Sequence, residues 1–177
     1  ATMFAGAPIR NKKNEVIALL TLRINPYNEL FPLLEKKRLG ETGETYAFDK
    51  NGFMLSHSRF ESELEEQDLL KRLETKDHAI RLYDPGSILI EHPNSGDQIK
   101  PIFTEMAQSA MRGESGSNVK GYRDYRGVNV VGAWHWFPEV DIGITSEQDV
   151  SDAYSTFYYV RKLILAVSGI ICLLIIL

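Results

Sequence analysis

The chain has 177 residues, of which 44% are hydrophobic and 25% are charged, so it holds enough apolar material for one core. Its net charge of -4 excludes the broad positive field with which proteins bind nucleic acid. The one cysteine excludes a disulfide framework within the chain and a cysteine-based zinc site. The first residues contain neither an initiator methionine nor a secretion signal, so we expect a segment of a longer protein.

The first 24 residues predict a pair of strands. Met3 to Ile9 precedes a polar turn, and Val16 to Ile24 follows it with apolar residues at alternate positions. Because two strands alone are only marginally stable, they need a larger sheet. We therefore expect them to be the end of a preceding domain.

Residues 25–39 predict a connecting helix. Asn25 suits the N-cap, Pro26 suits the first helical position, and Gly40 follows the basic last turn. We expect one helix over residues 26–38 and a second domain from about residue 40.

The second domain opens with a hairpin and continues with helices. Thr45 to Phe48 and Phe53 to Ser56 predict two short strands joined by an Asn-Gly turn. Leucines or other apolar residues then recur at helical spacing in two segments, residues 63–75 and residues 101–112, with a loop-like stretch between them.

The end of this domain predicts three strands, over residues 117–125, 128–137 and 142–148. Their connections are so short that neighbouring strands must be antiparallel. The whole pattern predicts an α+β fold, with a five-stranded antiparallel sheet and flanking helices. If the first hairpin adds beside the last strand, the sheet is PAS-like.

The C-terminal segment indicates a membrane helix. From Leu163 to Leu177 the chain carries no charge and spans about 22 Å as a helix, whereas a hydrocarbon core of about 30 Å needs roughly 20 residues. A helix that is apolar on every side has no solvated face in a small soluble domain. We expect an unbroken exit helix over residues 149–177, capped by Asp149 or Ser151, which runs into a truncated transmembrane helix.

Three segments carry a family resemblance. Residues 40–59, GETGETYAFDKNGFMLSHSR, contain a Gly-rich opening, a strand, an Asp-x-x-Gly turn and a second strand. Residues 121–134, GYRDYRGVNVVGAW, supply closing strands, and GITSE at residues 143–147 precedes the exit helix. In this order they resemble the membrane-proximal module of double Cache (dCache, PDC) sensor domains. Residues 7–9 and 16–18 are similar to the final strands of the membrane-distal module.

The resemblance implies a division of the chain. Residues 1–24 would be the last strands of a truncated membrane-distal module, and residues 25–39 would be the connecting helix. Residues 40–148 would form the membrane-proximal module, and residues 149–177 would be the exit helix that runs into the membrane. It also implies that the chain is the signal-input part of a bacterial transmembrane receptor in the inner (plasma) membrane. The sensor domain would then be periplasmic or extracellular. Such receptors commonly pair as homodimers through helices. Most of the distal module, where they commonly bind ligands, is missing, so no family ligand residue is carried over.

Four neighbouring residues are the main ligand-binding candidates. Strand alternation places Tyr122 and Asp124 on one face, and Arg123 and Tyr125 on the other. An arginine beside aromatic rings suits a small carboxylate, which favours an amino or carboxylic acid as the ligand. The alternative is cross-strand packing with a surface Arg–Asp pair, which contributes little.

Three further candidates are Trp134, His57 and Arg59. A tryptophan on an apolar strand face is more often core than ligand cage, whereas His57 and Arg59 leave the second strand where they could face a pocket. Neighbours on a strand point opposite ways, so the serine before His57 cannot use it as a base, and we expect no catalytic residue. The histidines, including His78 and His92, lack a second ligand at metal-binding spacing, so no metal or cofactor is expected.

Three functions follow from these patterns. The first is an extracytoplasmic sensor of a small solute that signals through the exit helix. The second is a spacer or dimerisation module of such a receptor that binds nothing. The third is a cytosolic tail-anchored protein or enzyme, which the basic pair Arg161-Lys162 beside the apolar run favours weakly.

Overall fold

The computed structural model describes residues 3–36, 38–66, 69, 79–89, 91 and 102–176. These residues form a two-stranded sheet, β1-β2, and a four-stranded antiparallel sheet in the order β3-β6-β5-β4. The strands are β1 (Met3–Arg10), β2 (Val16–Ile24), β3 (Glu44–Asp49), β4 (Gly116–Arg123), β5 (Asn129–Phe137) and β6 (Ile142–Asp149). The helices are α1 (Pro26–Glu29), α2 (Phe31–Lys36), α3 (Glu61–Glu66), α5 (Glu105–Met111), α6 (Val150–Ala153) and α7 (Ser155–Ile176).

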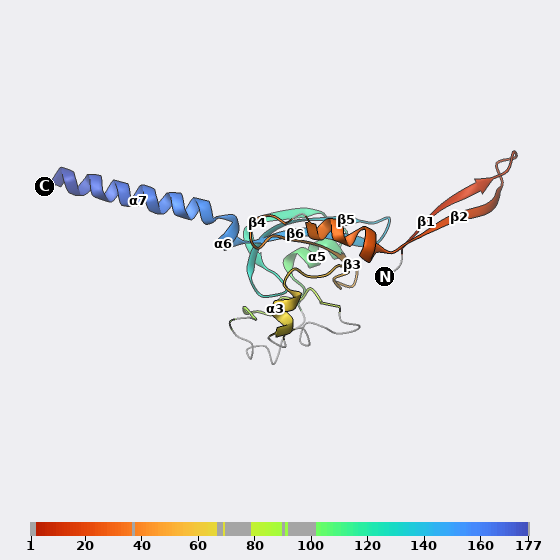
Figure 1. Cartoon of the computed structure of the whole chain (residues 1–177), viewed down its shortest axis with the longest axis horizontal. Coiled ribbons are helices and arrows are strands. Elements are labelled where there is room, and N and C mark those ends of the chain that lie inside the picture. The colour runs from red at the N-terminus through yellow and green to blue at the C-terminus, as the bar shows by residue number, and fades with distance from the viewer. Residues whose placement is uncertain are drawn as a thin grey trace.

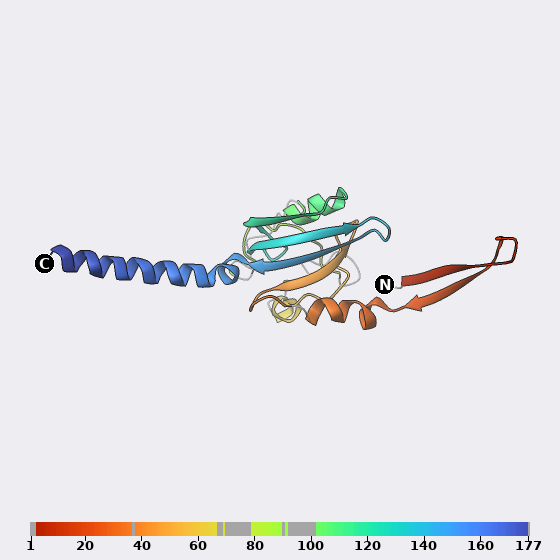
Figure 2. The same ribbon diagram turned by 90° about the horizontal axis from the view of Figure 1, so that it is seen from above.

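The molecule is elongated. The β1-β2 ribbon leaves one end of the four-stranded sheet and α7 leaves the other (Figure 1). Seen from above, the four strands lie side by side and β6 leads directly into the C-terminal helices (Figure 2). This arrangement places the last strand of the sheet in line with the apolar helix.

The β1-β2 ribbon confirms the two predicted N-terminal strands. Asn14 has a left-handed φ of 63° in the turn, and the Asn11 side chain accepts the backbone N–H groups of Lys13 and Glu15. Large apolar side chains remain exposed on the ribbon, for example 67% at Phe4 and 65% at Leu20. Within the described residues, the ribbon has no sheet to cover it.

The prediction of a fifth strand at residues 53–56 is wrong. Gly52, with φ of 75°, completes the expected turn, and Met54 then forms only an isolated bridge to Phe48. One step further, the hydroxyl of Ser56 accepts the N–H of Ala47 in place of a backbone carbonyl. The side chain therefore ends the ladder. The first hairpin does lie beside the last strand, because β3 pairs with β6.

Three predicted helices differ from the structure. The single helix over residues 26–38 breaks at Leu30 into α1 and α2, because Pro32 has no N–H to continue the first helix but fits the first turn of a second one. The helix at residues 101–112 begins only at Glu105, after the N-cap Thr104. Of the helix at residues 63–75, α3 covers the first part, and most of the rest lies outside the described residues, as do His78 and His92.

The core lies between the four-stranded sheet and α5. Apolar and aromatic side chains from β3, β4 and β5 pack with α3, α5 and the segment around residues 80–89. Aromatic rings dominate, with edge-on contacts between Tyr46 and Tyr125 and between Tyr122 and Trp134, each at 6.0 Å. The face of the sheet that points to α5, called the inner face below, therefore holds the core.

The exit helix is interrupted, contrary to the prediction of an unbroken helix from residue 149. Helix α6 ends at Tyr154, where φ is -104° and ψ is 10°, and α7 begins at Ser155. The Tyr154 hydroxyl donates to the carbonyl of Val119 in β4 at 2.7 Å. This bond holds the short helix α6 against the sheet while α7 leaves it.

Candidate functional site

Buried polar side chains gather on and beside the inner face of the sheet. Glu44, Asp124, Arg126 and Glu147 are each at most 5% exposed, although charged residues are rarely buried without partners. Tyrosine hydroxyls and Asp149 complete the group. We call it the carboxylate cluster; its members are Glu44, Tyr46, Tyr122, Asp124, Tyr125, Arg126, Glu147 and Asp149.

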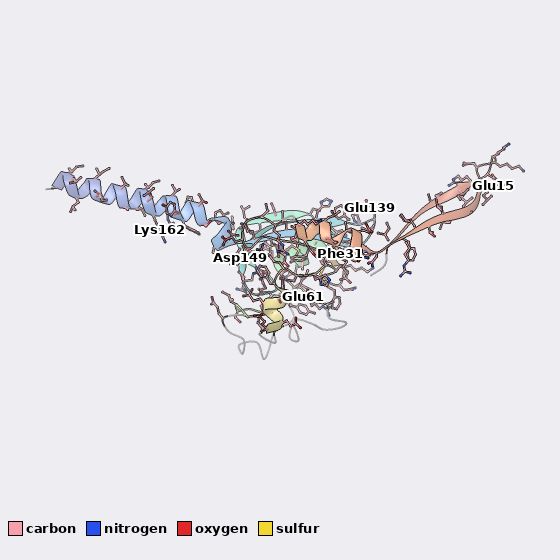
Figure 3. The ribbon with its side chains drawn as sticks, in the orientation of Figure 1. Glu15, Phe31, Glu61, Glu139, Asp149 and Lys162 are labelled. Carbon is pink, nitrogen blue, oxygen red and sulfur yellow. The ribbon has the colours of Figure 1, made fainter. Side chains whose placement is uncertain are left out.

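Arg126 joins two carboxylates of this cluster. Its Nε donates to Asp124 Oδ2 and its Nη2 to Asp149 Oδ1, both at 2.6 Å. Asp124 also accepts the backbone N–H groups of Arg126 and Val128, which closes the turn between β4 and β5. The guanidinium lies 3.8 Å from the centre of the Phe60 ring, a cation–π contact. Arg126 therefore ties this turn to the start of α6, where Asp149 is the N-cap residue (Figure 3).

Glu147 of β6 is bound by two tyrosines, and no cation bonds to it within the described part of the chain. Tyr46 donates to Oε2 at 2.8 Å and Tyr122 to Oε1 at 2.6 Å. The bond from β4 to β6 must pass over β5, and Gly132 makes room for it, because a Cβ there would lie 2.5 Å from the Tyr122 hydroxyl. Burial, followed by the charge of Asp124, raises the pKa of Glu147 to about 8.

Glu44 of β3 lies opposite Glu147 of β6 in the sheet. Its carboxylate accepts the hydroxyl of Tyr125 at 2.9 Å and the backbone N–H of Arg59 at 2.7 Å. The Tyr125 hydroxyl also lies 2.6 Å from Ser58 Oγ. Burial raises the pKa of Glu44, whereas these hydrogen bonds lower it.

The base of the exit helix is fastened to the sheet at a second point. Asp152 Oδ2 accepts the backbone N–H groups of Glu41 and Thr42, the Thr42 hydroxyl and the Gln148 amide, at 2.8–3.0 Å. The Gln148 bond and those from Thr42 lower the pKa of Asp152 to about 2. Three parts of the chain therefore hold α6. The loop before β3 bonds to Asp152, the β4-β5 turn reaches Asp149 through Arg126, and β4 accepts the hydroxyl of Tyr154.

An open groove of about 740 Å³ lies between α5 and β4. This volume is in the range of small-molecule sites. Its lining combines aromatic rings with both signs of charge, and includes Asp84, Phe103, Glu105, Arg112, Tyr122, Arg123 and Trp134. Tyr122 belongs to both the groove and the carboxylate cluster, so an occupant of the groove would lie next to a donor of Glu147.

A second, smaller pocket of about 230 Å³ lies beside β3. It is polar, and Arg38, His57, Arg59 and the buried Glu44 are among its lining residues. The Nδ1 of His57 lies 3.0 Å from Glu61, and Arg59 donates to the carbonyl of Gly43. In the described part of the chain, no three His, Cys, Asp or Glu side chains gather as a metal site.

The structure divides the predicted ligand-binding residues among three places. Tyr122, Arg123 and Trp134 line the groove, whereas His57 and Arg59 line the second pocket. Asp124 and Tyr125 lie in the carboxylate cluster.

Two details of the prediction are wrong. Tyr125 does not share a face with Arg123, because β4 ends at Arg123 and the turn directs Tyr125 into the core. The Arg–Asp pair at Asp124 is buried rather than on the surface, and its arginine is Arg126. Arg123 pairs instead with Asp84 at 2.8 Å.

The prediction missed Glu44, Tyr46 and Glu147. A signal for Glu147 was present, because alternation along β6 places it on the same face as Gly143 and Thr145, which are buried. An acidic residue at an inward strand position is unusual enough to indicate a polar site.

Replacing Arg126 with methionine should lower the free energy of unfolding by about 3–5 kcal/mol, because Asp124 and Asp149 lose a buried counter-charge. The matched variant R123M removes a half-exposed pair and should cost at most about 1 kcal/mol. Urea unfolding in detergent micelles, followed by tryptophan fluorescence, measures both. Equal losses in the two variants would contradict the structural role assigned to Arg126.

Comparisons with known proteins give one structural likeness. No family model and no curated protein matches the chain. The chain is similar to the crystal structure of the periplasmic sensory domain of the Campylobacter jejuni chemoreceptor Tlp1, with a TM-score of 0.45 and 16% sequence identity. The match covers 86% of this chain and 45% of that one, so this chain spans less than half of that structure.

Proposed function

We propose that this chain is the extracytoplasmic sensor module of a bacterial transmembrane receptor, anchored in the inner membrane by α7. The exposure of α7 carries the proposal. From Ser155 to Ile175 the helix is long and apolar enough to cross a membrane, and none of this span is buried against the rest of the protein. Its 22 residues extend about 33 Å, close to the hydrocarbon thickness of a bilayer. So much apolar surface requires a nonaqueous environment.

The connection between sheet and helix supports a signalling role. Strand β6 carries Glu147 and Asp149 and continues directly into α6 and α7. Because the cluster and Asp152 hold the base of the helix from three directions, a change in the sheet would move α6. A receptor needs such a link between two arrangements of similar free energy. The module would act without catalysis, and as a homodimer through its helices.

The sheet order supports a more specific proposal. The first hairpin adds beside the last strand, which is the condition for a PAS-like sheet, although its second strand is reduced to a bridge. Together with the sequence resemblance, this favours the membrane-proximal module of a double Cache domain. The small solute, an amino or carboxylic acid, would bind in the groove, where Tyr122, Arg123 and Trp134 meet.

The spacer or dimerisation module remains the second candidate, and one observation favours it. The charged groups of the groove already have partners within the chain: Arg123 pairs with Asp84, Arg112 with Glu114, and Glu105 accepts the Asn118 amide. A ligand would have to compete with these contacts.

Cysteine labelling tests the membrane arrangement. The exposed Glu139 lies far from α7 (Figure 3), and E139C should react with a membrane-impermeant maleimide in intact spheroplasts. The natural Cys172 in α7 serves as the control and should stay unreactive there, since it would lie in lipid. Labelling of E139C only after lysis would place the domain in the cytoplasm, and labelling of Cys172 in intact membranes would exclude a spanning α7.

A solute screen separates the sensor from the spacer. A ligand should raise the melting temperature by mass action and change the fluorescence of Trp134. R123A should then weaken binding about tenfold or more, because it removes a charged hydrogen bond, whereas R59A, in the second pocket, should not. Loss of binding in R59A alone would place the ligand in that pocket. A screen of amino and carboxylic acids without any shift would favour the spacer.

A further inference from the structure

The carboxyl group of Glu147 is buried, and among the residues that the structure describes no cation bonds to it. Both of its oxygens accept tyrosine hydroxyls, and the guanidinium of Arg126 is committed to Asp124 and Asp149. A buried carboxylate with neutral donors alone is costly in its ionised form. Protonation relieves this cost.

Burial and the neighbouring carboxylates favour the protonated form of Glu147. Among the described residues, those that bond it or act on it by charge are Tyr46 and Glu44 from β3, Tyr122 from β4 and Asp124 from the turn. The inner face of β5 and the buried residues of α5 add no charge. Burial first, and the negative charge of Asp124 and Glu44 next, raise the pKa of Glu147 to about 8, against which the two tyrosine bonds work.

The hydrogen bond between Tyr122 and Glu147 can run in either direction. The Tyr122 hydroxyl oxygen lies 2.6 Å from Glu147 Oε1, and a tyrosine hydroxyl can donate or accept. When Glu147 is ionised, Tyr122 donates to it. When Glu147 is protonated, the acid can donate to Tyr122 instead. The direction of this hydrogen bond thus differs between the two protonation states.

The hydrogen bond between Tyr122 and Glu147 lies next to both the groove and the base of the exit helix. Tyr122 lines the groove and contacts Trp134 edge-on at 6.0 Å. Glu147 lies two residues before Asp149, the N-cap of α6. A change at Glu147 therefore acts on the strand that leads to the exit helix.

We propose that the Glu147 carboxyl, clamped by Tyr46 and Tyr122, is a proton-sensing element, through which the module responds to the pH outside the membrane. The proposal rests on the proposed sensor function and names the proton as one of its inputs. The step is an acid–base reaction: the Glu147 O–H bond breaks, the proton passes to solvent, and the Tyr122 hydroxyl changes from accepting the proton of the acid to donating to the carboxylate.

Infrared spectroscopy of the whole chain in micelles tests the proton directly. The carboxylic acid C=O band of Glu147 should be present at about pH 6.5 and lost with a midpoint of about 8. E147Q should lack this band on both sides of the midpoint, whereas the exposed control E139Q should show the same band and the same loss as the wild type. Y122F should move the midpoint upward, because it removes a donor that stabilises the carboxylate. Trp134 fluorescence should follow the same midpoint in the wild type and not in E147Q.

Thermal unfolding gives a second readout. The folded-state pKa of Glu147 lies above the ordinary value of 4.5, so the folded protein holds more protons than the unfolded chain between about pH 4.5 and about 8. The melting temperature should therefore fall as pH rises through this window. In E147Q the fall should be smaller, whereas E139Q should match the wild type.

Each other outcome overturns the proposal. A band already absent at about pH 6.5 would show that Glu147 is ionised in the resting state, and a band that persists above about pH 9.5 would make it a permanent hydrogen-bond donor. Titration without a change in Trp134 fluorescence would remove the link to the groove. All of these results are independent of the cysteine labelling, so a failure of the proton proposal is distinct from a failure of the membrane arrangement.

Discussion

The buried guanidinium of Arg126 connects the β4-β5 turn to the end of β6. Its two carboxylate partners come from the β4-β5 turn and from the end of β6, and the ring of Phe60 lies against its face. Without this cation, Asp124 and Asp149 would repel each other where the sheet ends and the exit helix begins. This joint lies at the base of α6, after which α7 leaves the domain.

A polar core of this kind costs stability, because every buried charge gives up water. Apolar residues of similar volume would make a more stable sheet. The carboxylate cluster instead gives the inner face hydrogen bonds that connect three strands, from Tyr122 on β4 over Gly132 to Glu147 on β6 and Tyr46 on β3. Such networks can adopt discrete alternative arrangements, which a close-packed apolar core does not offer. That property suits the signalling role proposed above.

The regular parts of the fold could be predicted from local pattern. The three C-terminal strands, the N-terminal strand pair and the apolar helix follow from alternation, turn residues and length. The break at Tyr154 could not be predicted, because it depends on a hydrogen bond to Val119, a residue 35 positions away. The missing strand at residues 53–56 has a similar origin, since the competing acceptor is the side chain of Ser56. In both places a hydrogen bond between a side chain and a distant backbone group decided the outcome.

The candidate site was only partly predictable for a related reason. Tyr122 and Arg123 were named as candidates because an arginine stands beside aromatic residues in the sequence, and the folded chain places them with Trp134 along one groove. Glu44 and Glu147 were missed because their partners come from other strands, and sequence spacing does not show which carboxylate a tyrosine reaches. The pairing of Arg126 with Asp149 spans 23 residues and becomes visible only in the folded chain.

Hydrogen exchange of the exit-helix base tests the central role of Arg126 most directly. In micelles, amides of residues 150–154 should exchange about tenfold faster or more in R126M than in the wild type, measured relative to the amides of β3 in the same molecule. Unchanged relative exchange at residues 150–154, in a variant that remains folded, would contradict the view that Arg126 fastens the exit helix to the sheet.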